Sequence, residues 1–163
     1  MLINGEKSNA TPSLSFSVIN VPIVSQYAYA GYLTGYADDE YIDTLPTIPY
    51  LDDREGYANY MAFEVHGDSM DDGSTDAYTE GEKVICREVD PLLWKDSKLN
   101  INKRDYVIVH SEGIIIKKIT KHDVERHTIV VHSLNPEYAD KEIDLAEVRK
   151  LFSIIASVKS RRL

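Results

Sequence analysis

From residue 61 onward, apolar and polar positions alternate along the chain with a period of two. In the segment 61–66, Phe63 and Val65 fall on one face of an extended chain, and Glu64 falls on the other. Alternation of this kind, in runs rich in β-branched residues, is typical of half-buried strands. We therefore expect a mostly β fold with little helix, built as a compact, mostly antiparallel sheet or barrel. The expected strands are 61–66, 83–89, 106–110, 113–120 and 127–132, with polar turns at 71–74, 80–82 and 111–113.

The C-terminal segment changes its period partway along. Apolar residues recur at helical spacing from Leu145 to Phe152, whereas from Phe152 to Val158 they alternate with polar residues. We predict a short helical turn near 144–149, followed by a strand near 151–159.

Residues 18–60 have a different character from the rest of the chain. This zone holds eight of the eleven tyrosines and shows little clean periodicity. Its proline and glycine content favours extended, looping chain over helix. Because tyrosine packs its ring while its hydroxyl stays wet, the zone can lie across the surface of a core; irregular packing without a further role is the alternative. The predicted organisation is a linker or disordered arm at 1–17, this Tyr- and Pro-rich segment at 18–60, and a β core at 61–163.

The balance of charge argues against direct binding to DNA. The chain has 18 basic and 27 acidic side chains, for a formal net charge of −9. Gripping a phosphate backbone requires clustered Lys and Arg. A role at DNA would therefore need another domain or subunit.

Several weaker signals concern location and metals. No apolar stretch approaches the roughly 20 residues of a membrane span, and the N-terminus lacks a signal-peptide pattern. The lone cysteine, Cys86, is interpreted as a buried strand residue, and a single cysteine suits a reducing cytoplasm. We expect no cofactor and no metal, because the histidines form no ligand-spaced cluster with Cys or Glu. They are His66, His110, His122, His127 and His132.

Two separated segments carry candidate chemistry. Ser69 follows Gly67, whose freedom of backbone conformation permits a tight turn at the end of a strand. Lys117 lies in an isoleucine-rich run, where it shares one strand face with Ile115 and Ile119. Apolar surroundings lower the pKa of a lysine, and a neutral lysine can accept the proton of a serine hydroxyl. The pair therefore has the parts of a Ser-Lys hydrolytic dyad.

Each half of this pair also has an ordinary structural interpretation. A Gly-Asp-Ser sequence is common in turns, and an isoleucine-rich strand often carries an edge lysine. Strand phasing favours Lys117 over Lys118 as the base, because Lys118 takes a less enclosed position and reads as a solvated neighbour. In the predicted turn, the backbone N–H groups of Ser69 and Met70 could face a developing oxyanion.

Three motifs in this order resemble the LexA-type peptidase domain, the family of LexA, lambda-type phage repressors and UmuD-type mutagenesis proteins. The motifs lie at 65–70, 116–119 and 133–138, and the resemblance spans about residues 21–160. It implies a LexA/signal-peptidase-like β fold with Ser69 as nucleophile and Lys117 as base. The family cuts its own chain at an Ala-Gly or Cys-Gly bond, which points to Ala30-Gly31 here.

Two departures from the family pattern stand out. The spacing from Ser69 to Lys117 is 48 residues, roughly ten more than usual, and we ascribe the excess to an excursion at 90–99 that holds the single tryptophan, Trp94. No helix-turn-helix pattern precedes the peptidase region. We therefore expect the C-terminal part of an XRE-type, phage-like repressor whose DNA-binding half is absent, with a natively short UmuD-like protein as the alternative.

Three functions follow from the resemblance. The first is a homodimeric repressor domain that is inactivated by self-cleavage under stimulation by RecA filaments. The second is a dimerisation and regulatory module whose peptidase is silent. The third is a UmuD-like accessory protein of a polymerase. A signal peptidase is disfavoured, because it would need a membrane anchor.

Overall fold

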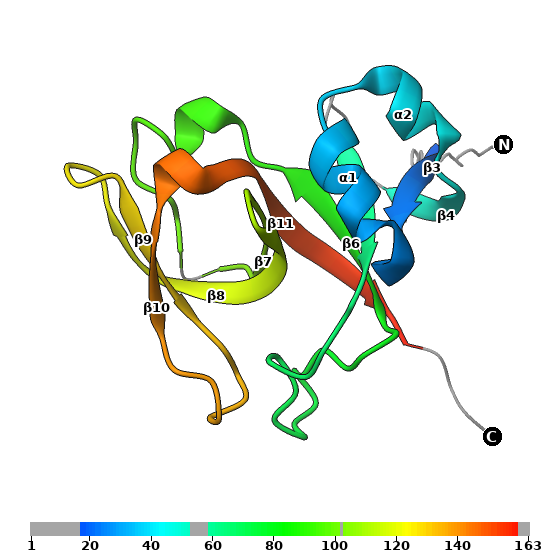
Figure 1. The fold of residues 1–163 in the computed structure, drawn as a ribbon. Coiled ribbons are helices and arrows are strands. Elements are labelled where there is room, and N and C mark those ends of the chain that lie inside the picture. The colour runs from blue at the N-terminus through cyan, green and yellow to red at the C-terminus, as the bar shows by residue number, and fades with distance from the viewer. Residues whose placement is uncertain (1–16, 53–58, 102, 160–163) are drawn as a thin grey trace, which may run out of the picture.

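A computed structural model describes residues 17–52, 59–101 and 103–159 of the chain. Its described strands form one nine-stranded sheet in the order β10-β9-β8-β7-β11-β6-β5-β3-β4 (Figure 1). The strands are β3 (Ser17–Val24), β4 (Thr47–Asp52), β5 (Tyr60–Glu64), β6 (Lys83–Glu88), β7 (Tyr106–His110), β8 (Gly113–Asp123), β9 (Thr128–His132), β10 (Lys141–Asp144) and β11 (Val148–Val158). The helices are α1 (Tyr29–Gly35) and α2 (Asp39–Thr44), with 3-10 turns η1 (Gln26–Ala28), η2 (Pro91–Leu93) and η3 (Leu145–Glu147).

The predicted mostly β fold is confirmed. Each strand expected between residues 61 and 132 is present, with ends shifted by a few residues at most. The C-terminal prediction is also confirmed, since the turn η3 leads directly into β11. All neighbouring strands pair antiparallel except β3 and β5, which run parallel through Ile23 and Val24.

Strand β11 joins two hydrophobic clusters because it pairs with β7 along its first half and with β6 along its second. Phe63 and Phe152 meet edge to face in one cluster, at 5.3 Å between ring centroids, and the helices α1 and α2 pack against it. The other cluster is centred on β7 to β10 and includes Leu151. Figure 1 shows the helices at one end of the sheet and the strands β8 to β10 curled at the other.

The excursion at 90–99 is a structural part of this second cluster. Trp94 is fully buried, and its indole N–H donates to the carbonyl of Val89 over 3.3 Å. Farther along, the backbone N–H of Leu99 donates to Nδ1 of the buried His122 over 3.0 Å. The extra residues between the two candidate site segments therefore close one end of the core.

The expectation of extended, looping chain across 18–60 was wrong for residues 29–44, which form two short helices. Tertiary packing explains the difference. Tyr32 is buried, and Gly35 lies so close to the ring of Tyr41 that a Cβ atom there would be 2.5 Å from it. The side chain of Asp38 caps α2 by accepting from the N–H of Glu40. Contacts of this kind, between the two helices or at a cap, leave no periodic apolar pattern in the sequence.

Two further predictions have different outcomes. Apart from Ser17, which begins β3, the predicted arm at 1–17 lies outside the described residues. Cys86 is buried on β6, as predicted, and burial raises the pKa of its thiol. Among the described residues, no helix has the length and apolar character needed to cross a bilayer.

Candidate active site

Ser69 lies in a tight turn that follows β5. Gly67 enters this turn with φ of +86°, a left-handed conformation that side-chain-bearing residues rarely adopt. The N–H of Gly67 donates to the carboxylate of Glu80 over 3.1 Å, and the N–H of Asp71 donates to the carbonyl of Asp68 over 3.1 Å. These bonds close the turn on both sides of the serine.

Lys117 reaches this turn from the middle of β8. Its Nζ lies 2.6 Å from Oγ of Ser69, across 48 residues of sequence. Burial is the main cause that lowers the pKa of Lys117 below its usual 10.5, and the nearby charge of Lys141 lowers it further. The two side chains are therefore in hydrogen-bond contact, with the amine biased toward its neutral form.

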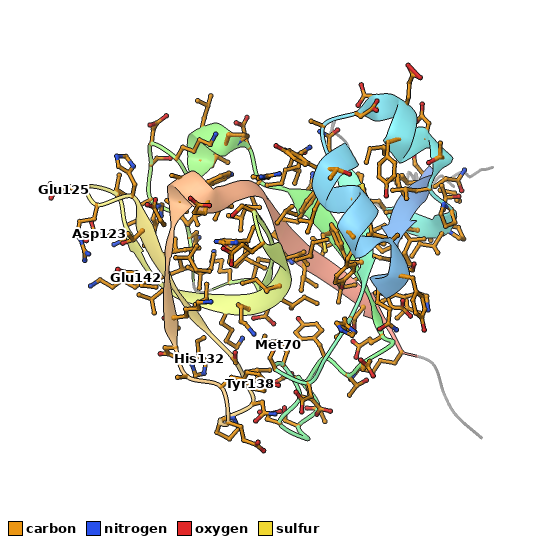
Figure 2. All side chains as sticks on the ribbon, in the orientation of Figure 1. Met70, Asp123, Glu125, His132, Tyr138 and Glu142 are labelled. Carbon is orange, nitrogen blue, oxygen red and sulfur yellow. The ribbon has the colours of Figure 1, made fainter. Side chains whose placement is uncertain are left out.

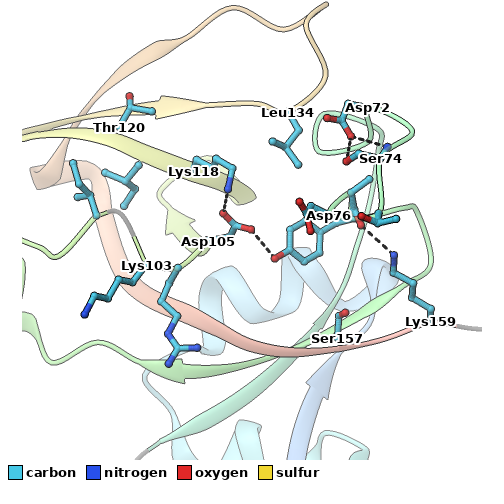
Figure 3. A pocket seen from close by; sticks show the side chains of 16 residues that line it. Asp72, Ser74, Asp76, Lys103, Asp105, Lys118, Thr120, Leu134, Ser157 and Lys159 are labelled. Atoms are coloured by element: carbon cyan, nitrogen blue, oxygen red, sulfur yellow. Dashed lines mark hydrogen bonds and ion pairs between the residues drawn. The ribbon is translucent and has the colours of Figure 1, made fainter.

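Lys118 points to a different group of residues. Its Nζ lies 2.6 Å from Asp105, and the same carboxylate accepts from the hydroxyl of Tyr78 over 2.7 Å (Figure 3). This network borders a cavity of about 590 Å³ whose lining includes neither Ser69 nor Lys117. The side chain of Lys118 is 42% exposed, which agrees with the expected solvated neighbour, and the ion pair with Asp105 gives it a partner as well.

The loop after β9, residues 133–138, holds the serine turn from the other side. The backbone N–H of Asn135 donates to the carbonyl of Ser69 over 3.0 Å, and its side-chain amide donates to the carbonyl of Asp68 over 3.1 Å. The hydroxyl of Tyr138 donates to the carboxylate of Asp68 over 2.5 Å. Figure 2 labels Tyr138 of this loop and Met70 of the serine turn.

The backbone near Ser69 retains donors for an anion. Among the hydrogen bonds of the described residues, none uses the N–H of Ser69 or Met70. A small cavity of about 60 Å³ adjoins Ser69 and is lined by Tyr29, Gly67 and Ile114–Ile116 among others. Space and unused donors therefore lie beside the serine hydroxyl.

Ala30 and Gly31 lie in α1, which packs beside β8, and both residues are exposed. Their neighbour Tyr29 lines the cavity at Ser69, and its hydroxyl donates to the backbone carbonyl of Glu64. The candidate scissile bond thus lies on a segment anchored at the site, but in helical rather than extended conformation.

Sequence reasoning assigned no role to Asp68 and Tyr138 at the site, nor to Asp105 beside Lys118. Asp68 and Tyr138 carried a usable signal, since both belong to the motifs that resemble the family. Asp105 carried none, because only the folded sheet brings it to Lys118. In the described part of the chain, no three His, Cys, Asp or Glu side chains gather as a metal site would require.

Comparison with known proteins gives one positive result. The family model described as Peptidase S24-like matches residues 22–159, which is most of the chain. A search of curated proteins found no match. The matched range contains the serine turn, β8 and the loop at 133–138, and it agrees with the resemblance to LexA-type domains. The chain therefore belongs to the Peptidase S24-like family.

Proposed function

We propose that this chain is the self-cleaving peptidase domain of a transcriptional repressor, with Ser69 as nucleophile and Lys117 as general base. The observation that carries the proposal is the 2.6 Å contact between Oγ and Nζ of these residues. Burial of the amine supports it as well, because only a neutral lysine can take the hydroxyl proton near physiological pH.

The proposed reaction cuts the peptide bond between Ala30 and Gly31. Oγ of Ser69 attacks the carbonyl carbon of Ala30 while its proton passes to Nζ of Lys117. The N–H groups of Ser69 and Met70 stabilise the oxyanion. The amine of Gly31 then leaves with the proton from Lys117. Water gives a proton to the neutral amine of Lys117 and attacks the acyl-enzyme, and the bond to Oγ of Ser69 breaks as that proton returns to the serine.

The cleavage segment must change conformation for this reaction. In a helix, the backbone carbonyl lies along the helix axis and takes part in helical hydrogen bonding. Helix α1 therefore has to unwind locally before the bond can lie across Ser69. The anchor at Tyr29 keeps the segment beside the site during this change. The cavity of about 60 Å³ has room for a small side chain, which suits alanine before the cut.

The proposed setting is that of the family. The domain acts as a homodimer, with its own cleavage segment as the substrate, and a RecA filament on single-stranded DNA stimulates the cut. Another domain binds the operator, since the net charge of −9 disfavours direct contact with DNA.

The deciding experiment is mass spectrometry after incubation at alkaline pH, with and without RecA filaments. We expect two fragments, residues 1–30 and 31–163, that form at a rate independent of protein concentration. A cut at another bond would disprove the assignment of Ala30-Gly31.

Matched variants test the roles of the two side chains. Ser69→Ala and Lys117→Met should each abolish cleavage, because the nucleophile or its base is lost. Ser74→Ala and Lys118→Met alter neighbouring residues of the same types and should retain it. Cleavage that persists in Ser69→Ala would refute the mechanism.

A second function is favoured by the helical conformation of the candidate bond. In this case the domain is a dimerisation and regulatory module whose peptidase is silent, and α1 is a permanent structural element. Packing of Gly35 against the ring of Tyr41 supports such a role. A chain that stays intact at about pH 10 with RecA filaments present, although folded, would favour this function.

A further inference from the structure

The loop at 133–138 contacts both halves of the candidate dyad. Asn135 holds the carbonyls of Asp68 and Ser69, and its own side-chain oxygen accepts from the N–H of Glu137 over 3.0 Å. Asn135 is buried, and its side-chain hydrogen bonds are partly buried. Asn135 thus attaches the loop to the serine turn three residues before Tyr138.

Tyr138 makes one contact with each half of the dyad. Its hydroxyl donates to Asp68, the residue before the serine. Nζ of Lys117 lies 5.7 Å from the centroid of its ring, within the range of a cation–π contact. A tyrosine is the side chain that can do both, because it has a polar end and an aromatic face.

We propose that Tyr138 is a positioning residue that couples the serine turn to the lysine. Its hydroxyl fixes Asp68 and through it the direction of the Ser69 side chain. Its ring limits the positions open to Nζ of Lys117. The inference rests on the proposed peptidase function, and it gives a role to a residue that lies outside the dyad.

The groups around Lys117 set the expected direction of the effect. The ring of Tyr138 attracts the ammonium form, whereas Lys141 on β10 repels it and burial penalises it. On β7, Tyr106 stands opposite Lys117 in the sheet register. Asp68, in the serine turn, is bound to Tyr138, and its hydrogen bond raises the pKa of that hydroxyl. The pKa of Tyr138 is thus raised, whereas that of Lys117 is lowered.

Two substitutions separate the hydroxyl from the ring. Tyr138→Phe removes the bond to Asp68 and keeps the ring, so the maximal cleavage rate should fall about tenfold. The pH midpoint of cleavage should not move. Tyr138→Leu also removes the ring, so the midpoint should fall by about half a pH unit, and the rate should fall further.

A second readout does not depend on cleavage. The pKa of Lys117 is followed by NMR of its εCH₂ group in Ser69→Ala protein, with and without each Tyr138 substitution. Tyr138→Leu should lower this pKa, and Tyr138→Phe should leave it unchanged. If the wild-type chain does not cleave but this difference is present, the peptidase proposal fails while the contact with the lysine is established.

The control is Tyr50 on β4, at the opposite edge of the sheet from β10. Tyr50→Phe and Tyr50→Leu should leave the rate, the pH midpoint and the pKa of Lys117 as they are. The inference is overturned if Tyr138→Leu behaves as the Tyr50 variants do, or if Tyr138→Phe and Tyr138→Leu show equal loss with the same midpoint.

Discussion

At the scale of the residue, the proposed base Lys117 has a lowered pKa because of where β8 places it. The same side chain on an exposed strand would be charged at neutral pH and could not accept a proton. Burial and the charge of Lys141 both act against the ammonium form. The proposed chemistry would therefore depend on a neighbouring positive charge as well as on apolar packing.

The first prediction concerns pH. Only the neutral amine is active, so the cleavage rate should rise with pH and level off above the pKa of Lys117. Because that pKa is lowered, the midpoint should fall below 10.5. Lys141→Gln removes a repulsive charge, so it should move the midpoint upward by a few tenths of a unit, and less in high salt. Lys121→Gln is the control, and a midpoint at or above 10.5 in the wild-type chain would contradict the argument.

The second prediction concerns Gly67. Its φ of +86° is strained for any residue with a side chain, although a Cβ there would meet no atom within 4 Å. Gly67→Ala should therefore shift the serine turn and slow cleavage about tenfold, at a cost of about 1 kcal/mol in unfolding free energy. At Gly113 a Cβ would also meet no atom within 4 Å, and φ is not positive. Gly113→Ala should therefore change neither the cleavage rate nor the unfolding free energy. Rate assays and urea unfolding measure both effects.

At the scale of the element, β-branched runs and alternation in the sequence predicted the strands β5 to β9 and β11, but not the short strand β10. The helices α1 and α2 could not be predicted this way. They are short, and their stability comes from contacts such as that of Gly35 with Tyr41, which are invisible to a local pattern. The excursion at 90–99 was recognised as extra length, but its role in the core was not.

The third prediction tests that role. Trp94 is fully buried in the cluster under β7 to β10, so Trp94→Ala should lower the free energy of unfolding by about 3–5 kcal/mol. Leu92→Ala, in the same excursion but 69% exposed, should change it by less than about 0.5 kcal/mol. Chemical denaturation measures both, and equal effects would show that the excursion does not anchor the core.

At the scale of the whole molecule, the site joins three segments that are far apart in sequence. Ser69 and Lys117 could be paired in advance from the glycine-bearing turn and the apolar run, and the order of the motifs then strengthened that pairing. The bonds of Tyr138 to Asp68 and of Lys118 to Asp105 depend on how the sheet curves, which the sequence did not reveal. The parallel pairing of β3 with β5 was likewise not predicted.

That parallel pairing determines what a cut at Ala30-Gly31 would leave behind. Strand β3 lies inside the sheet, between β5 and β4, while the bond lies beyond its end. The nicked chain should therefore elute as one particle in size-exclusion chromatography and separate only on a denaturing gel. Spontaneous separation would show that β3 is weakly held. Inactivation by such a cut would occur in two stages. The peptide bond would break first, and the two fragments would separate only later, when β3 leaves the sheet.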